Sequence, residues 1–128
     1  MNLLVVGNSG NIGSNIYSEI SSLFTSSENN IDGINTSILD LRSTVNIENY
    51  LNDLNYLWDV IIFLVGRAHK KGKPKDYKLY EEQNVMVLKN FMIQLKKKDL
   101  LPKKFIFAST ISVYGEQMNV SYYDETYD

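Results

Sequence analysis

The sequence contains no cysteine, a single histidine and two prolines among its 128 residues. Without cysteine, the chain forms no disulfide and offers no thiolate nucleophile or cysteine-ligated metal site. One histidine is too few for a site with several histidine ligands, so we expect no metal centre. The chain also lacks an apolar run of about 18 residues, and its start does not resemble a signal peptide. These absences predict a soluble, cytoplasmic protein.

Neither sign of charge dominates, since 15 acidic and 13 basic residues give a net charge of −2. This balance gives no reason to expect nucleic acid or an anionic membrane as a partner. The length allows one domain, which we place at residues 1–128. An apolar fraction of 44% is enough to bury a core at this size.

Short apolar runs alternate with segments of helical periodicity. Runs without alternation predict strands buried on both faces, and apolar residues three and four apart predict helices. The expected strands cover residues 3–6, 31–35, 37–41, 60–65 and 105–108. The expected helices cover 11–24, a segment capped by Ser43 or Thr44 with the apolar face Ile47, Leu51 and Leu54, and 76–99 with the apolar face Val85, Leu88, Met92 and Leu95. This order predicts an α/β fold with a doubly wound parallel sheet of about five strands.

A glycine-rich turn joins the first expected strand to the first expected helix. Its pattern is G-x-x-G-x-x-G, formed by Gly7, Gly10 and Gly13. The first glycine permits the tight turn, the second lets the backbone approach a diphosphate, and the third lets the helix pack close to the sheet. The helix N-terminus offers free N–H groups to phosphate oxygens. The pattern predicts a dinucleotide-binding turn of the Rossmann type, and the alternative is a turn that binds nothing.

A dinucleotide site of this type has an acidic residue about 20 positions further on, which holds the adenosine ribose. The candidates here are Asp32 and Asn35, and Asn35 fits the strand end better. An amide bonds ribose hydroxyls without repelling a 2′-phosphate, and Arg42 is not far away in the sequence. The residues therefore favour NAD slightly and leave NADP open.

A second motif follows the last expected strand, where Ser109-Thr110-Ile111-Ser112-Val113-Tyr114-Gly115 matches S-[ST]-x-x-V-Y-G. Together with the glycine-rich turn and the segment 59–66, in this order, it resembles the NAD-dependent epimerase/dehydratase family. These are extended short-chain dehydrogenases/reductases that modify nucleotide sugars. Asn84 and the acidic segment 123–126 fit the same pattern, so the resemblance covers essentially the whole chain.

The resemblance implies a role for each matched position. Thr110 matches the residue that bonds the oxygen of the substrate, and a hydroxyl suits an oxygen that changes between alcohol and ketone. Asp40 and Leu41 match the pair that contacts adenine, and the strand end at 64–66 lines the nicotinamide-side ribose. The implied cofactor-binding residues are Gly7, Ser9, Gly10, Asn11, Ile12, Gly13, Asn35, Asp40, Leu41, Leu64, Val65, Gly66, Asn84 and Ser109.

The chain lacks the Tyr-x-x-x-Lys pair on which the chemistry of this family depends, because no tyrosine is followed by lysine four positions later. We therefore expect the cofactor-binding part of a nucleotide-sugar epimerase, dehydratase or reductase, truncated before the substrate domain and inactive alone. An alternative is a stand-alone, non-catalytic NAD(P)-binding sensor or interaction module, and a flavodoxin-like FMN domain is a third reading. Uncovered apolar surface after the last strand predicts a homo-oligomer.

Overall fold

The computed structural model describes residues 1–66 and 77–109. Four parallel strands form one sheet in the order β2-β1-β3-β4. Their bounds are Asn2–Val6 for β1, Asn30–Ile34 for β2, Val60–Phe63 for β3 and Lys104–Phe107 for β4. The strand β1 is central, with Leu4 opposite both Asp32 and Ile61. The chain therefore winds outward from β1 in both directions, which confirms the predicted doubly wound parallel sheet.

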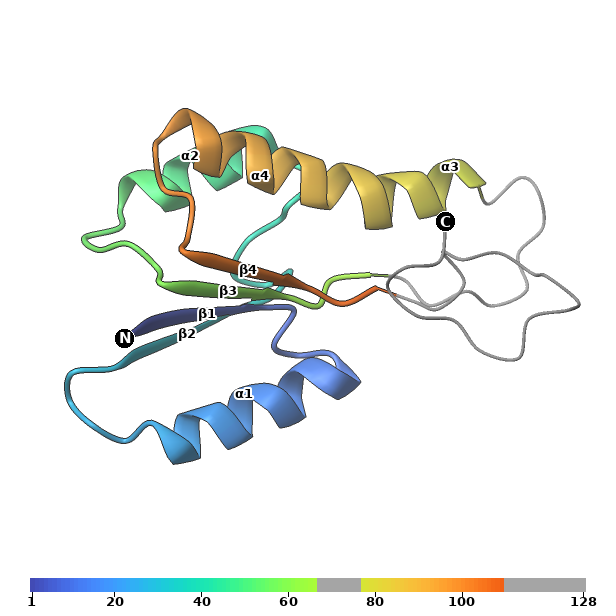
Figure 1. Cartoon of the computed structure of the whole chain (residues 1–128). Helices are drawn as coiled ribbons and strands as arrows, with labels where there is room; N and C mark the ends of the chain where they lie inside the picture. The colour runs from blue at the N-terminus through green and yellow to red at the C-terminus, as the bar shows by residue number, and fades with distance from the viewer. Residues whose placement is uncertain (67–76, 110–128) are drawn as a thin grey trace, which may run out of the picture.

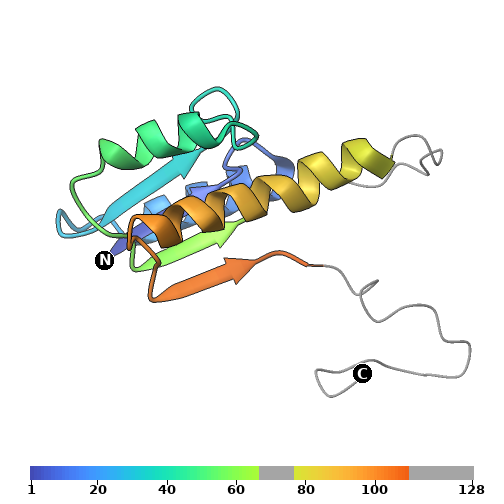
Figure 2. The same ribbon diagram turned by 90° about the horizontal axis from the view of Figure 1, so that it is seen from above.

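Helices cover both faces of the sheet (Figure 1). The helix α1 (Asn11–Leu23) lies on one face, and α2 (Thr44–Asn52) and α4 (Val87–Lys97) lie on the other. A short helix α3 (Tyr77–Tyr80) and a π-helical segment, η2 (Glu81–Met86), run without interruption into α4. Figure 2 shows α2 and α4 side by side above the sheet.

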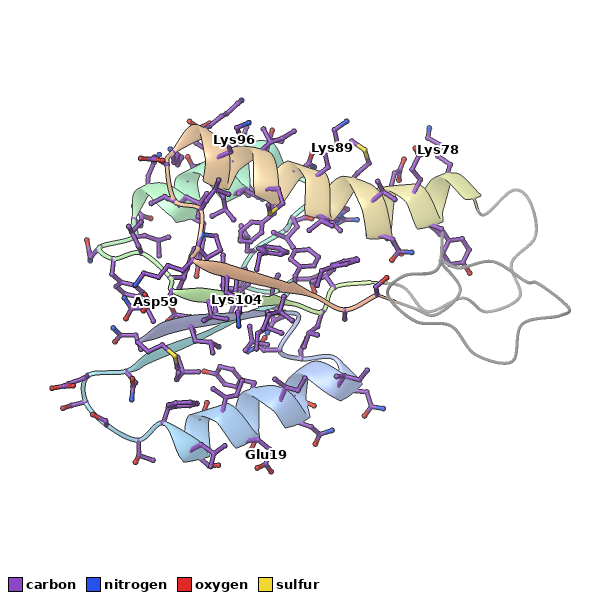
Figure 3. The ribbon with its side chains drawn as sticks, in the orientation of Figure 1. Glu19, Asp59, Lys78, Lys89, Lys96 and Lys104 are labelled. Atoms are coloured by element: carbon purple, nitrogen blue, oxygen red, sulfur yellow. The ribbon has the colours of Figure 1, made fainter. Side chains whose placement is uncertain are left out.

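The main core lies between the sheet and the pair α2 and α4. The ring of Phe63 lies at its centre, with centroids 6.1 Å from Phe91 and 6.0 Å from Phe105. Lys78, Lys89 and Lys96 point away from the sheet, so the outer face of the long helix is charged (Figure 3). The buried residues of this core are Leu4, Val6, Ile34, Leu39, Leu41, Ile47, Leu51, Trp58, Ile61, Phe63, Val87, Phe91 and Leu95.

The strand β3 is buried on one face only, so the prediction of burial on both faces was wrong. Ile61 and Phe63 are fully buried, whereas Val60 and Ile62 are half-buried. The cause is the position of α1, which packs against β1 and β2 and leaves the same face of β3 less covered. The unbroken apolar run in the sequence does not report this difference between the faces.

The segment Ser37–Leu41 is a loop, so the prediction of a strand there was wrong, and the described sheet has four strands instead of five. Asn35 starts a turn, because its side-chain Oδ1 accepts a hydrogen bond from the backbone N–H of Ser37 at 2.9 Å. The alternating apolar residues of the loop, Leu39 and Leu41, both enter the core. Their alternation reflects packing of a loop against the core and not a pleated strand.

The buried face of the long helix also differs from the prediction. Val85 was expected in the core, but its exposed fraction is 56%, while Val87 is 5% exposed. Leu88 and Met92 are half-buried beside the core, and the buried face is formed by Val87, Phe91, Gln94 and Leu95. The wider turns of η2 change the angular position of every residue before α4, so a regular helical period does not hold across it.

The helix α2 begins as predicted, with Ser43 as its N-cap, and the Oγ of Ser43 accepts a hydrogen bond from Asn46 N–H at 3.2 Å. None of the helices in residues 1–66 and 77–109 has the length and apolar character that a bilayer crossing requires. In the same residues, His, Cys, Asp and Glu side chains form no cluster of three that could hold a metal ion.

Candidate functional site

A cavity of about 610 Å³ lies where the carboxyl ends of β1, β2 and β3 meet. In doubly wound sheets, ligands bind just outside the carboxyl ends of the strands. They bind at the switch point, where the segments that leave two adjacent strands run to opposite faces of the sheet. Here that point is β1, whose neighbours are β2 and β3. The lining residues are Val6, Gly7, Ser9, Gly10, Ile34, Asn35, Thr36, Leu39, Asp40, Leu41, Arg42, Leu64, Val65, Gly66, Gln83 and Val87.

Most of the residues singled out in the sequence meet in this cavity. They are Gly7, Ser9, Gly10, Asn35, Asp40, Leu41, Leu64, Val65 and Gly66. Asn11, Ile12, Gly13, Asn84 and Ser109 are in the described structure but do not line the cavity. Thr110 lies outside the described residues.

Two glycines of the turn are required by the fold. Gly7 has a φ of +95°, a conformation that side chains rarely adopt. A Cβ on Gly13 would lie 2.1 Å from the carbonyl oxygen of Gly7, so α1 reaches the turn only because residue 13 has no side chain. The turn is also tied to β2, because Gly7 N–H donates to the carbonyl of Ile34 at 2.7 Å.

The middle glycine of the turn is different. Gly10 has a φ of −72° and a ψ of 165°, which any residue adopts easily. A Cβ added to it would come no closer than 3.4 Å to another heavy atom, the carbonyl oxygen of Gly7. Neither backbone conformation nor packing therefore requires glycine at this position. Gly10 lines the cavity, where a side chain would occupy space open to a ligand.

The N-terminus of α1 follows immediately. Gly10 is its N-cap, and no side chain caps the helix there. The helical ladder starts with Ser14 N–H, which donates to the carbonyl of Gly10 at 2.8 Å. The N–H groups of the first turn have no acceptor within the helix, and the helix dipole places partial positive charge at this end. This arrangement suits an anionic group next to the glycine turn.

The structure separates the two candidates for the ribose contact. Asn35 lines the cavity, with its Nδ2 donating to Asn8 Oδ1 at 3.1 Å. Asp32 lies in the middle of β2 and does not line it. The carboxylate of Asp32 accepts hydrogen bonds from the Tyr56 hydroxyl and from Trp58 Nε1, the latter at 2.7 Å. Asp32 is thus a packing residue, and Asn35 is available to a ligand.

The charged groups of the cavity are paired with each other. Arg42 donates two side-chain hydrogen bonds to Asp40, at 2.9 and 2.8 Å. These bonds hold the pKa of the Asp40 carboxyl below its usual value and raise the pKa of Arg42, to which the negative charge of Glu82 also contributes. Both side chains remain ionised at neutral pH.

The long helix supplies the remaining wall. Gln83 from η2 and Val87 from α4 line the cavity. Asn84 does not line it, but its Oδ1 lies 3.2 Å from where a Cβ on Gly66 would be. Sequence reasoning did not select Thr36, Leu39, Gln83 or Val87. The neighbourhood of Asn35 and Asp40 could have indicated the first two, and the regular spacing of Val87 with Phe91 and Leu95 could have indicated Val87. Gln83 lies in the irregular segment η2, where a regular helical period does not apply.

The fold and the site together define a domain of the Rossmann type, with its ligand cavity at the switch point of the sheet. The sequence places it more narrowly, because residues 3–127 match the model of the NAD dependent epimerase/dehydratase family. The chain belongs to this family. No curated protein matches it.

Solved structures with the same fold include UDP-glucose 4-epimerase from Thermus thermophilus in complex with NAD, with a TM-score of 0.77, 21% identity, and coverage of 99% of this chain and 43% of that chain. UDP-glucose 4-epimerase from Bifidobacterium longum in complex with NAD+ and UDP has a TM-score of 0.67 and 17% identity. The match covers 90% of this chain and 38% of that chain. dTDP-4-dehydrorhamnose reductase from Bacillus anthracis in complex with NADP has a TM-score of 0.61 and 14% identity. The match covers 75% of this chain and 32% of that chain. The chain thus spans less than half the length of each structure.

Proposed function

We propose that the cavity at the carboxyl ends of β1, β2 and β3 binds a nicotinamide dinucleotide. The observation that carries this proposal is Gly10, a glycine that neither the backbone nor the packing requires and that lines the cavity beside an uncapped helix N-terminus. A diphosphate needs this combination of close backbone approach and free N–H groups. Family membership and structural neighbours in complex with NAD or NADP support the proposal.

The lining residues provide a place for each part of the dinucleotide. Gly7, Ser9 and Gly10, with the N-terminus of α1, would hold the diphosphate. Asn35 would hold the adenosine ribose, because its amide has hydrogen-bonding capacity beyond its contacts with Asn8 and Ser37. Asp40 and Leu41 would contact the adenine, and the segment 64–66 would line the nicotinamide-side ribose.

We also propose that this domain serves a nucleotide-sugar epimerase, dehydratase or reductase. When bound, the nicotinamide would supply a hydride acceptor and donor, and Thr110 would bond the oxygen of the substrate. The Ser109–Gly115 motif favours this proposal over a stand-alone binding module. Because no tyrosine of this chain is followed by lysine four positions later, the 128 residues should show no turnover. Measurable epimerisation of a nucleotide sugar by the purified chain would contradict that part.

Calorimetric titration of the chain with NAD tests the binding proposal. We expect saturable heat from the natural sequence and at least about a tenfold loss of affinity in Gly10→Ala, since a Cβ occupies the space of the diphosphate. Ser18→Ala, at an exposed position in the middle of α1, is the control and should bind like the natural sequence. Absence of binding by the natural sequence, or equal affinity of Gly10→Ala, would count against the proposal.

The predicted oligomer is a separate proposal, and the edge of the sheet supports it. Within the residues that the structure describes, β4 lies at an edge of the sheet, and its Ile106 and Phe107 are 44% and 47% exposed. Exposed strand edges and apolar surface favour association with a second copy. Light scattering after size exclusion should therefore report a dimer or a larger assembly, and a monomer at all concentrations would refute it.

A further inference from the structure

The charged side chains at the adenosine end of the cavity belong to one short loop. Of the described residues that line the cavity, Asp40 and Arg42 are the ones with formal charge. The guanidinium of Arg42 forms two parallel bonds to Asp40, from Nε to Oδ1 and from Nη2 to Oδ2. The backbone N–H of Arg42 donates to Oδ1 as well, at 3.0 Å. Asp40 therefore occupies the Nε–Nη2 edge of the guanidinium.

The loop that holds this pair is fixed from both sides. The backbone N–H of Ser43, the N-cap of α2, donates to the carbonyl of Asp40 at 3.1 Å. From α4, the Nδ2 of Asn90 lies 3.3 Å from the carbonyl oxygens of both Leu41 and Arg42. Glu82 on η2 adds a second negative charge near Arg42. The loop that carries Asp40 and Arg42 is thus anchored to both α2 and α4.

A 2′-phosphate distinguishes NADP from NAD, and it is recognised by an arginine whose N–H groups are free to form paired bonds to its oxygens. The end of β2 has no acid to select against that phosphate, because Asn35 is neutral. We propose that Asp40 performs the selection in this chain: by occupying the Nε–Nη2 edge of Arg42 and balancing its charge, it weakens the attraction of Arg42 for a 2′-phosphate and makes the site prefer NAD. This inference rests on the proposed binding of a nicotinamide dinucleotide.

The test is calorimetric titration of the full chain and of Asp40→Asn with NAD and with NADP. The natural sequence should bind NAD at least about tenfold more tightly than NADP, a difference of about 1.4 kcal/mol. Asp40→Asn keeps an oxygen for the backbone N–H of Arg42 but removes the charge that engages the guanidinium. It should lower the preference for NAD about tenfold, since a free arginine then reaches the phosphate.

The double variant Asp40→Asn with Arg42→Gln shows whether the effect passes through the arginine. It should return to a clear preference for NAD. An unchanged preference in Asp40→Asn, or a double variant that behaves like Asp40→Asn, would overturn the inference and leave dinucleotide binding intact. Equal affinity of the natural sequence for NAD and NADP would overturn it too.

The single variant Arg42→Gln provides a second test of the inference, which remains possible if Asp40→Asn does not fold. The side chain of Arg42 is 66% exposed, so its loss should leave the fold unchanged. Asp40 then faces the cavity without its cation, and the preference for NAD should stay or grow. A weaker preference in this variant would contradict the inference. Failure of every variant and of the natural sequence to bind either dinucleotide would instead overturn the proposed function and the inference with it.

Discussion

At the scale of single residues, the fold requires glycine at two positions of the glycine-rich turn and does not require it at the third. Gly7 and Gly13 are explained by a positive φ and by a close approach of backbone atoms, and Gly10 by neither. The sequence allowed the roles of Gly7 and Gly13 to be predicted, because position in a strand–turn–helix unit determines them, and the diphosphate contact of Gly10 stays a prediction. It did not allow the pairing of Asp40 with Arg42 to be predicted, because that depends on the conformation of a loop.

The two kinds of glycine should respond differently to the same substitution. Gly13→Ala forces a Cβ against the Gly7 carbonyl and should lower the free energy of unfolding by at least about 2 kcal/mol. Gly10→Ala should change it by less than about 1 kcal/mol, because the backbone there suits alanine. Urea denaturation followed by circular dichroism measures both. Similar losses in the two variants would refute the division of roles.

Substitution of Asp99, at the end of α4, should make the protein more stable. It is exposed and has a φ of +56°, just past the helix end, where the N–H of Leu100 donates to the carbonyl of Leu95 at 2.9 Å. Glycine is favoured in this conformation, and a negative charge is unfavourable near a helix C-terminus. Asp99→Gly should raise the free energy of unfolding by about 0.5 to 1 kcal/mol.

The matched control is Asp99→Ala, which removes the charge but keeps a Cβ in the left-handed conformation. Its stability should lie below that of Asp99→Gly in the same urea titration. If alanine stabilised as much as glycine, the backbone argument would fail and only the charge would remain as a cause.

At the scale of elements, regular periodicity predicted α1, α2, β1 and β4 well, and it failed where an element is irregular. The sequence of the loop at 37–41 has the alternating pattern of a strand because two of its apolar side chains, Leu39 and Leu41, enter the core. The segment η2 carries Val85, whose exposed fraction is 56%, whereas Val87, the first residue of α4, is buried at regular helical spacing from Phe91 and Leu95. The same segment places Gln83 at the wall of the cavity, so the sequence pattern did not predict this part of the site.

Two valines near this junction test the position of the helix. Val87→Ala removes two buried methyl groups and should cost about 2 kcal/mol of unfolding free energy. Val85→Ala changes a side chain that is 56% exposed and should cost less than about 0.5 kcal/mol. Thermal or urea denaturation of the two variants gives the comparison. The reverse order of losses would mean that the helix follows the regular period and buries Val85.

At the scale of the whole molecule, β2 is joined to the segment before β3 by Asp32, Tyr56 and Trp58. Burial raises the pKa of the Tyr56 hydroxyl, and its hydrogen bond to Asp32 raises it further. A raised pKa in the folded state means that this contribution to stability is complete below about pH 10, the ordinary tyrosine value. It is lost as the pH rises through the pKa of the folded protein.

The stability of the natural sequence should therefore fall as the pH rises above about 10. Tyr56→Phe lacks the ionisable hydroxyl, so it should start from a lower stability at pH 8 but lose less between pH 8 and pH 11. Urea denaturation at a series of pH values provides the slopes. Parallel slopes for the two proteins would show that Tyr56 does not cause the alkaline loss.

The central claim is that the cavity at the switch point of the sheet binds a nicotinamide dinucleotide. Its most direct test is NMR titration of the isotopically labelled chain with NAD, following every backbone N–H. We expect the shifts to concentrate on Gly7, Ser9, Gly10, Asn35 and the segment 64–66, and Gly10→Ala should weaken them together. Saturating NAD without shifts at these positions, or shifts confined to the amino ends of the strands, would contradict it.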